Sequence, residues 1–189
     1  GANDDWSTGV DGARLPAVAA QAGAFALPAG SRDAALLVQP TAGAYTEQLT
    51  GKGATGVAMI EAYDVAPVAG AAPLLNLSAR TRAGTGAEVL IAGFVVSGNT
   101  AKKVLVRAVG PTLGRAPFNV AGTLADPQLR LVRGADAVVR ENDNWESGND
   151  AALVAEAASR VGAFPLAAGG RDAALLLSLP PGTSSEQVT

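Results

Sequence analysis

The feature that most constrains this chain is an internal repeat. The segment Asn3-Asp4-Asp5-Trp6 returns as Asn142-Asp143-Asn144-Trp145. Farther along, Arg32-Asp33-Ala34-Ala35-Leu36-Leu37 returns as Arg171-Asp172-Ala173-Ala174-Leu175-Leu176. Both pairs are offset by 139 positions. Because a period of this length is the size of a domain rather than of one solenoid turn, the sequence predicts tandem modules arranged like beads on a string.

The repeat also sets the expected module boundaries. Residues 1–50 and 140–189 align without a gap and share 23 identical positions. The best candidate for a linker is residues 65–74, a segment with two prolines and no charge. We therefore assign residues 1–64 to the back part of one module. Residues 75–189 form the next module, which lacks the equivalent of the last hairpin strand.

Composition excludes several classes of function. The 189 residues are 48% hydrophobic and 16% charged, which is ample for a packed core. A net charge of -3 with few lysines offers no basic stripe for nucleic acid. The chain contains no cysteine and no histidine, so disulfides, thiol catalysis and the usual zinc sites are excluded, together with the commonest general base.

Hydropathy gives no sign of a membrane span. The longest apolar run, residues 89–96, suits a buried strand and is far too short to cross a bilayer. No signal peptide is visible, and the first residue is Gly1 rather than methionine. These features fit either a processed subunit or a window on a longer polypeptide.

Local patterns indicate a mainly β fold. Strands are predicted from continuous or alternating apolar runs at residues 88–97, 103–109, 128–132, 137–140 and 173–179. One short helix is predicted at residues 150–161, with Asp150 as a capping residue, and a weaker one at residues 11–22. In the first copy, residues 45–50 and 55–64 read as a hairpin. The pattern favours antiparallel β-sandwich repeat modules with one short helix per module.

Several segments together resemble a module that is repeated in large surface proteins of Verrucomicrobia and related bacteria. The matching stretches are residues 76–80 (NLSAR), 84–86 (GTG), 89–94 (VLIAGF), 104–113 (VLVRAVGPTL), 125–127 (ADP) and 142–145 (NDNW). The back half is also similar to the bacterial pre-peptidase C-terminal β-sandwich, through residues 126–131 and the Asn-Asp-Asn turn. These resemblances imply export and a structural or adhesive role. Neither implies a catalytic site or a specific ligand.

One glycine motif resembles a dinucleotide fingerprint. Residues 51–56, Gly-Lys-Gly-Ala-Thr-Gly, match the G-x-G-x-x-G pattern. That chemistry requires the N-terminus of a helix directly after the glycines, whereas a strand-like run follows at residues 57–63. We therefore interpret the motif as a hairpin turn, and no cofactor is expected.

Acidic and amide side chains gather near the repeated turn. Calcium favours oxygen ligands of this kind, but the spacing is not that of an EF-hand loop, and the same residue types form turns and caps without metal. We therefore favour the interpretation that these residues form turns and helix caps, and calcium binding is left open. The candidate ligands are Asn142, Asp143, Asn144, Glu146, Asn149 and Asp150 in the second copy, and Asn3, Asp4, Asp5 and Asp11 in the first.

Two further repeated features have a plain structural interpretation. We interpret the two Arg-Asp pairs, Arg32-Asp33 and Arg171-Asp172, as polar turns beside a buried strand. An exposed ion pair in such a turn contributes at most about 1 kcal/mol to stability. Trp6 and Trp145 read as anchors at the edge of the core rather than as sugar-binding platforms. No residue is assigned a catalytic role.

The expected function is therefore that of a non-enzymatic structural repeat in an extracellular or cell-surface filament, stalk or sheath. The alternative is a secreted adhesion or carbohydrate-binding module. The expected partners are other copies of the chain or flanking repeats. Since nothing after Thr189 repeats residues 51–64, residues 140–189 are expected to pack with a neighbouring copy.

Overall fold

The structure is a computed structural model that describes residues 1–51, 57–65, 76–133, 137–148 and 150–189. The chain divides into two units, Gly1–Leu75 and Asn76–Thr189. The predicted linker at residues 65–74 lies, except for Val65, outside the described residues.

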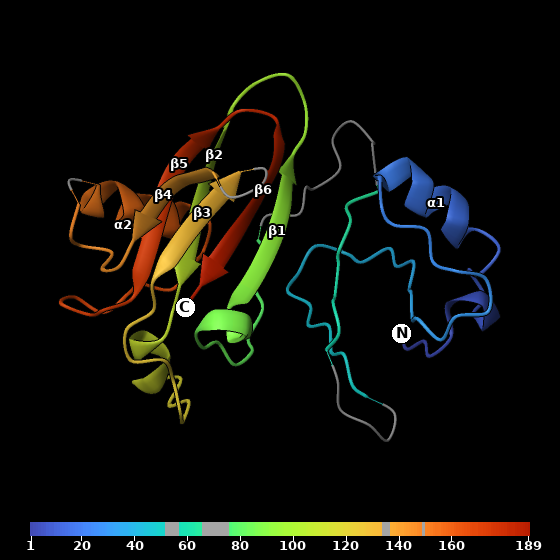
Figure 1. Ribbon diagram of the computed structural model, residues 1–189, viewed down its shortest axis with the longest axis horizontal. Helices are drawn as coiled ribbons and strands as arrows, with labels where there is room; N and C mark the ends of the chain where they lie inside the picture. Colours follow the sequence, from blue (N-terminus) through green and yellow to red (C-terminus); the bar gives the residue numbers. More distant parts are fainter. Residues whose placement is uncertain (52–56, 66–75, 134–136, 149) are drawn as a thin grey trace. The chain divides into compact units, whose positions relative to one another are not determined.

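The second unit contains two antiparallel sheets (Figure 1). Four strands form one sheet in the order β1-β6-β3-β4, and two strands form the other, β2-β5. The mainly β, sandwich-like prediction is confirmed. The strands are β1 (Leu90–Val96), β2 (Lys102–Ala108), β3 (Leu129–Arg133), β4 (Ala137–Asn142), β5 (Ala173–Leu179) and β6 (Gly182–Val188).

The core of this unit lies where apolar residues of four strands meet. Leu129 and Leu131 alternate on β3 and are fully buried, as the period of two predicts. They belong to one cluster with Val96 of β1, Val106 and Ala108 of β2, and Ala173, Leu175 and Leu179 of β5. The cluster thus draws on both sheets.

One helix, α2 (Ala151–Arg160), packs beside β5 and β2. Val154 and Ala158 are its buried residues, four positions apart on one face. Leu153, which directly precedes Val154, is exposed. Asp150 precedes the helix without a side-chain cap, because its carboxylate lies 3.5 Å from Arg140 instead.

The last strand of the chain occupies the interior of the larger sheet. β6 pairs with β1 on one side, from Leu90 opposite Val188, and with β3 on the other, from Leu129 opposite Val188. The expectation that residues 140–189 need a neighbouring copy is therefore wrong for β6. The front strands of its own unit already satisfy both of its edges.

The first unit is built differently. It holds a short 3-10 helix at Trp6–Thr8 and α1 (Leu15–Ala22), with Pro16 in the first turn of α1 and Gly23 at its left-handed C-cap. The described residues of this unit form no strand. The predicted hairpin is therefore wrong at residues 45–51 and 57–64, while residues 52–56 lie outside the described part.

The missing strands have a physical reason. In the second unit, β5 pairs with β2, and β6 lies between β1 and β3. All three of these partner strands come from residues 90–133, which precede the repeated segment. The first copy follows no such segment within residues 1–75. An isolated strand has no ladder to join, so the same apolar pattern stays irregular there.

Candidate functional site

The most constrained polar group in the second unit is the carboxylate of Asp172. It lies just before β5 and is fully buried. Its Oδ1 accepts hydrogen bonds from the backbone N–H groups of Gly110 at 2.9 Å and of Thr112 at 3.2 Å. Its Oδ2 accepts a third from the Thr112 hydroxyl at 2.6 Å. These donors offset the cost of burying a charge, so the carboxylate fastens the loop after β2 to the start of β5.

Thr112 extends this connection to a third segment. It lies in the 3-10 helix Pro111–Gly114, and its Oγ1 also accepts a hydrogen bond from the Ala167 N–H at 3.0 Å. Gly110 sits so close to the carbonyl of Leu124 that a Cβ at this position would overlap the oxygen. The loop therefore needs glycine at position 110 and a hydroxyl at position 112.

A second contact holds the segment between α2 and β5. Arg107 of β2 donates a hydrogen bond from Nη1 to the Phe164 carbonyl at 2.6 Å, and its guanidinium lies 4.5 Å from the centre of the Phe164 ring. Phe118 packs on the same ring, with centroids 4.6 Å apart. Burial lowers the pKa of Arg107, and the nearby charge of Asp172 acts in the opposite direction. This arginine is part of the packing.

The repeated Asn-Asp turn forms its own set of hydrogen bonds. Asn142 donates from Nδ2 to the Asn144 carbonyl at 3.0 Å and accepts at Oδ1 from the Ala174 N–H at 3.0 Å. Trp145 donates its backbone N–H to the Asp172 carbonyl at 2.8 Å and its indole N–H to the Ala167 carbonyl at 3.1 Å. The turn thus ties the end of β4 to the start of β5.

The first copy repeats these contacts at the same offset. Asn3 donates to the Asp5 carbonyl at 3.2 Å and accepts from the Ala35 N–H at 3.0 Å. The backbone N–H of Trp6 donates to the Asp33 carbonyl at 2.8 Å, and its indole N–H donates to the Pro28 carbonyl at 3.3 Å. Residues 3–35 therefore keep the turn of the complete module although they lack its sheet.

The polar-turn interpretation of the two Arg-Asp pairs is only partly right. Arg171 forms an exposed ion pair with Asp126 at 2.7 Å, as a polar turn would. Asp172 is instead the buried acceptor described above, and Asp33 in the first copy is exposed. One sequence feature points to burial of this carboxylate, because Asp172 directly precedes the apolar run of β5. Its hydrogen-bond donors, however, lie about 60 residues earlier, and no local pattern identifies them.

Three side chains of the second oxygen-rich turn have partners within the protein. Glu146 accepts a hydrogen bond from the Gly169 N–H at 2.7 Å, and Asp150 faces Arg140. Asn142 is engaged as above, while Asn149 lies outside the described residues. Among the residues that the structure describes, no group of three or more acidic side chains is arranged to hold a metal ion. The glycine motif lies mostly outside the described part, and no helix forms at residues 57–64 after it.

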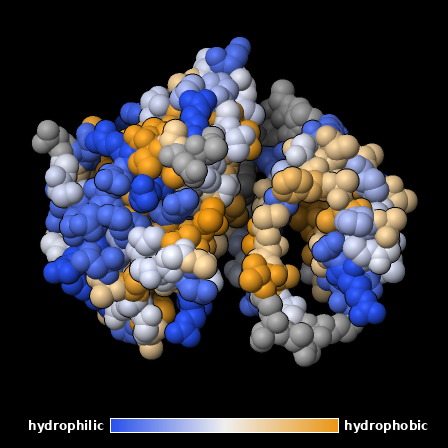
Figure 2. All heavy atoms as spheres, in the orientation of Figure 1, coloured by the Kyte–Doolittle hydropathy of each residue, from blue (hydrophilic) through white to orange (hydrophobic). Residues whose placement is uncertain are grey.

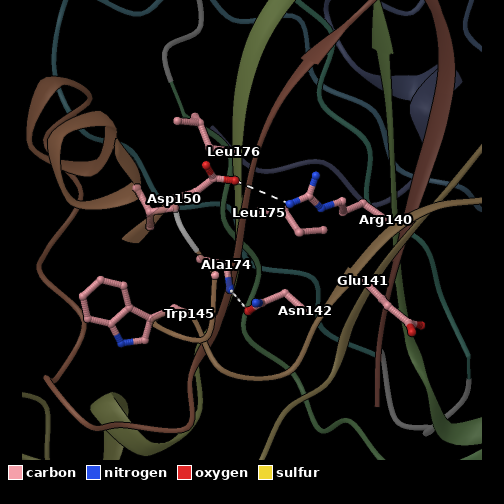
Figure 3. Close-up of a pocket in the computed structure, with 10 residues that line it drawn as sticks. Arg140, Glu141, Asn142, Trp145, Asp150, Ala174, Leu175 and Leu176 are labelled. Carbon is pink, nitrogen blue, oxygen red and sulfur yellow. Dashed lines mark hydrogen bonds and ion pairs between the residues drawn. The ribbon is translucent and has the colours of Figure 1, made fainter. Parts of the chain in front are cut away.

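A small pocket lies beside the second turn, between β4, α2 and β5 (Figure 3). Arg140 points toward Asp150 across it, Asn142 points toward the backbone of Ala174, and Glu141 points away. Trp145 lines another side and is half-buried, in agreement with its role as an anchor at the edge of the core. The polar side chains around the pocket have partners within the protein: Arg140 pairs with Asp150, Asn142 binds the backbone of Ala174, and Glu141 lies 3.6 Å from Arg130.

Comparisons of the chain with family models, with curated proteins and with solved structures return no match. Neither helix in the described part of the chain has the length and apolar character needed to cross a membrane. The contacts within the protein are therefore what bears on its function. Those contacts join segments of backbone to one another. The second unit has the complete set, and the first unit has only the part formed by Asn3 and Trp6.

Proposed function

We propose that this chain is a non-enzymatic structural repeat of an extracellular or cell-surface filament, stalk or sheath, whose modules join head to tail. The observation that carries the proposal is the recurrence of one set of contacts at a fixed offset. Asn3 and Trp6 make the same backbone contacts as Asn142 and Trp145. A feature repeated for catalysis would keep reactive groups, whereas here the repeated groups hold backbone.

The polar chemistry of the complete module supports the same function. Asp172, Thr112 and Arg107 are each engaged by groups of the protein itself. A general base must reach a substrate proton, and a carboxylate surrounded by three internal donors does not. These residues instead stabilise the path of the chain, as a load-resisting module requires.

The adhesion alternative is less well supported by the complete module. Binding of sugar or of another flat ligand generally uses exposed aromatic rings. Within the described residues of the second unit, Phe118 is the only exposed aromatic side chain, and its ring packs on Phe164. Trp145 has its indole N–H bound to the Ala167 carbonyl. We therefore place the structural function first.

The first unit supplies a surface suited to joining modules. Figure 2 shows apolar side chains, in orange, on the exterior of the described residues of this unit, 1–51 and 57–65. Met59 is 68% exposed there, and Ile60 is 51% exposed. Exposed apolar area of this kind is unfavourable in water and favours association. A contact between unlike surfaces that does not close into a ring produces a fibre.

The assembly state of the full chain tests this proposal. We expect sedimentation velocity to show mass rising with protein concentration without a limiting oligomer, and negative-stain electron microscopy to show filaments. Met59→Lys should reduce assembly by placing a charge on this apolar surface. Leu153→Lys is the matched control, because Leu153 is 50% exposed but lies on the complete module. A monodisperse monomer at every concentration contradicts the proposal.

A further inference from the structure

The first unit contains half of a binding site whose complete form is visible in the same chain. In the second unit, Asp172 accepts three hydrogen bonds from Gly110 and Thr112. Its equivalent Asp33 is exposed, and no described group of the first unit binds its carboxylate. The backbone around Asp33 is nevertheless arranged as around Asp172, since the Trp6 N–H binds the Asp33 carbonyl. The acceptor is therefore in place without its donors.

The strand that follows each aspartate shows the same contrast. In β5, Ala173, Leu175 and Leu177 pair with Ala108, Val106 and Val104 of β2. Their equivalents in the first unit are Ala34, Leu36 and Val38, which are exposed and outside any strand. These three residues keep an apolar character at alternate positions, so they suit the same partner strand.

A third element of the site is Phe25. Its equivalent, Phe164, is half-buried against Arg107 and Phe118. Phe25 is 72% exposed, and its partners would again come from the segment that contains β2 and the loop after it. The three open groups of the first unit therefore lack contacts with one and the same piece of a module.

We propose that Asp33, residues 34–38 and Phe25 form a docking site for a front half-module, a segment with the strand and loop chemistry of residues 76–139 that runs directly into Gly1. The inference rests on the proposed repeat architecture and names the partner of its open half. An added Gly-Pro-Thr loop donates to the Asp33 carboxylate, and an added β2-like strand pairs with residues 34–38. An arginine and an aromatic ring cover Phe25.

The direction of entry follows from β4. In the second unit β4 runs without a break into Asn142, and Leu129 of β3 pairs with Asn142. Since Asn3 is the equivalent of Asn142, a front half that ends at Gly1 enters in register. A second copy of the chain is a poorer donor, because its own β2 is already paired with β5 and its β1 and β3 with β6.

The docking is limited to these residues. Pro40 stands where Leu179 is buried, and proline donates no hydrogen bond to a ladder. Tyr45 stands where the small Ser184 is buried opposite Phe94. The site therefore ends before Pro40, and the equivalent of β6 would require a front half with a smaller residue opposite Tyr45.

Hydrogen exchange on a lengthened chain tests the inference. A second copy of residues 76–139 is joined directly before Gly1 of the full chain, which preserves the 139-residue offset. We expect the amides of residues 34–38 to exchange about 100-fold more slowly than in the original chain, as they enter a protected strand. Unchanged exchange at residues 34–38 would overturn the inference.

A single substitution separates docking from a general effect on folding. Asp33→Asn is introduced into both chains. In the lengthened chain it should remove most of the new protection, because an amide oxygen cannot accept all three donors as a carboxylate does. In the original chain, where Asp33 is exposed, it should change nothing. Equal effects in both chains, or protection that survives the substitution, would count against the site.

One other outcome would identify a different occupant. Protection of residues 34–38 that grows with the concentration of the original chain would assign the site to a second copy and overturn the proposed direction of entry. If residues 34–38 gain protection but no filaments form, this inference stands and the filament function is rejected. If filaments form but these residues gain no protection, the filament function stands and this inference is rejected.

Discussion

Thr112 donates a 2.6 Å hydrogen bond to the buried carboxylate of Asp172, across a sequence separation of 60 residues. This bond connects the loop after the second strand of the module to the start of its fifth. The loop belongs to the front of the module and the aspartate to its repeated back part. The contact therefore marks where the two halves of a module are joined.

Removing the charge at this junction should destabilise the second unit. Asp172→Asn leaves one acceptor oxygen for three donors and introduces a buried NH2 group, at an expected cost of about 3 kcal/mol in unfolding free energy. Urea unfolding followed by the far-ultraviolet circular dichroism of the sheets measures it. The matched control is Asp33→Asn, which is exposed and should stay within about 0.5 kcal/mol of the parent chain. Equal losses for both variants would contradict the account.

The hydroxyl of Thr112 can be tested apart from its volume. Thr112→Val keeps the shape but leaves Asp172 with one donor fewer and the Ala167 N–H without its acceptor, so a loss of about 2 kcal/mol is expected. Thr112→Ser keeps both hydrogen bonds and should retain most of the stability. If the serine and valine variants unfold at the same urea concentration, the hydroxyl does not have the role described.

Backbone contact makes Gly110 a sensitive position. Gly110→Ala places a Cβ against the Leu124 carbonyl, and the necessary movement of the loop would also disturb the Asp172 hydrogen bonds, at a cost of about 2 kcal/mol or more. Gly148→Ala is the control, since its Cβ would make only an ordinary contact with Asp150. Thermal unfolding should show a lowered Tm for the first variant alone, and a silent Gly110→Ala would be evidence against the close approach.

Chelation should leave the melting temperature of the protein nearly unchanged. Asn142, Glu146 and Asp150 each have a protein partner in the second turn. A metal that binds only the folded state would stabilise it by mass action, so removing such a metal would lower Tm. Differential scanning calorimetry with EDTA and with added calcium makes the comparison. A clear EDTA-sensitive shift would establish the calcium site that the turn chemistry argues against.

Much of the fold was predictable because its signals are local. The alternation at Leu129 and Leu131, the spacing of Val154 and Ala158, and the glycines that end both helices each act over a few residues. The position of β6 between β1 and β3 was not predictable in this way, because strand pairing over about 50 to 100 residues leaves no short pattern.

The difference between local and long-range signals also explains why the hairpin predicted in the first copy is wrong. Residues 45–50 carry the apolar pattern of a strand, yet strand formation depends on the neighbours that supply a ladder. The role of Asp172 was missed for a related reason, since its charge suggested an exposed turn and its donors are distant in sequence. Equivalent residues of the repeat form the same local turn, as Asn3 and Asn142 do, but the repeat alone does not specify the environment in which each of them lies.

The most direct measurement is hydrogen exchange in the original full chain, comparing residues 34–38 with residues 173–177. The two segments are equivalent in the repeat and similar in sequence, so intrinsic exchange rates differ little. The account predicts slow exchange at residues 173–177, which are paired with β2, and fast exchange at residues 34–38, which lack that strand. Equal protection of the two segments at low protein concentration would contradict it.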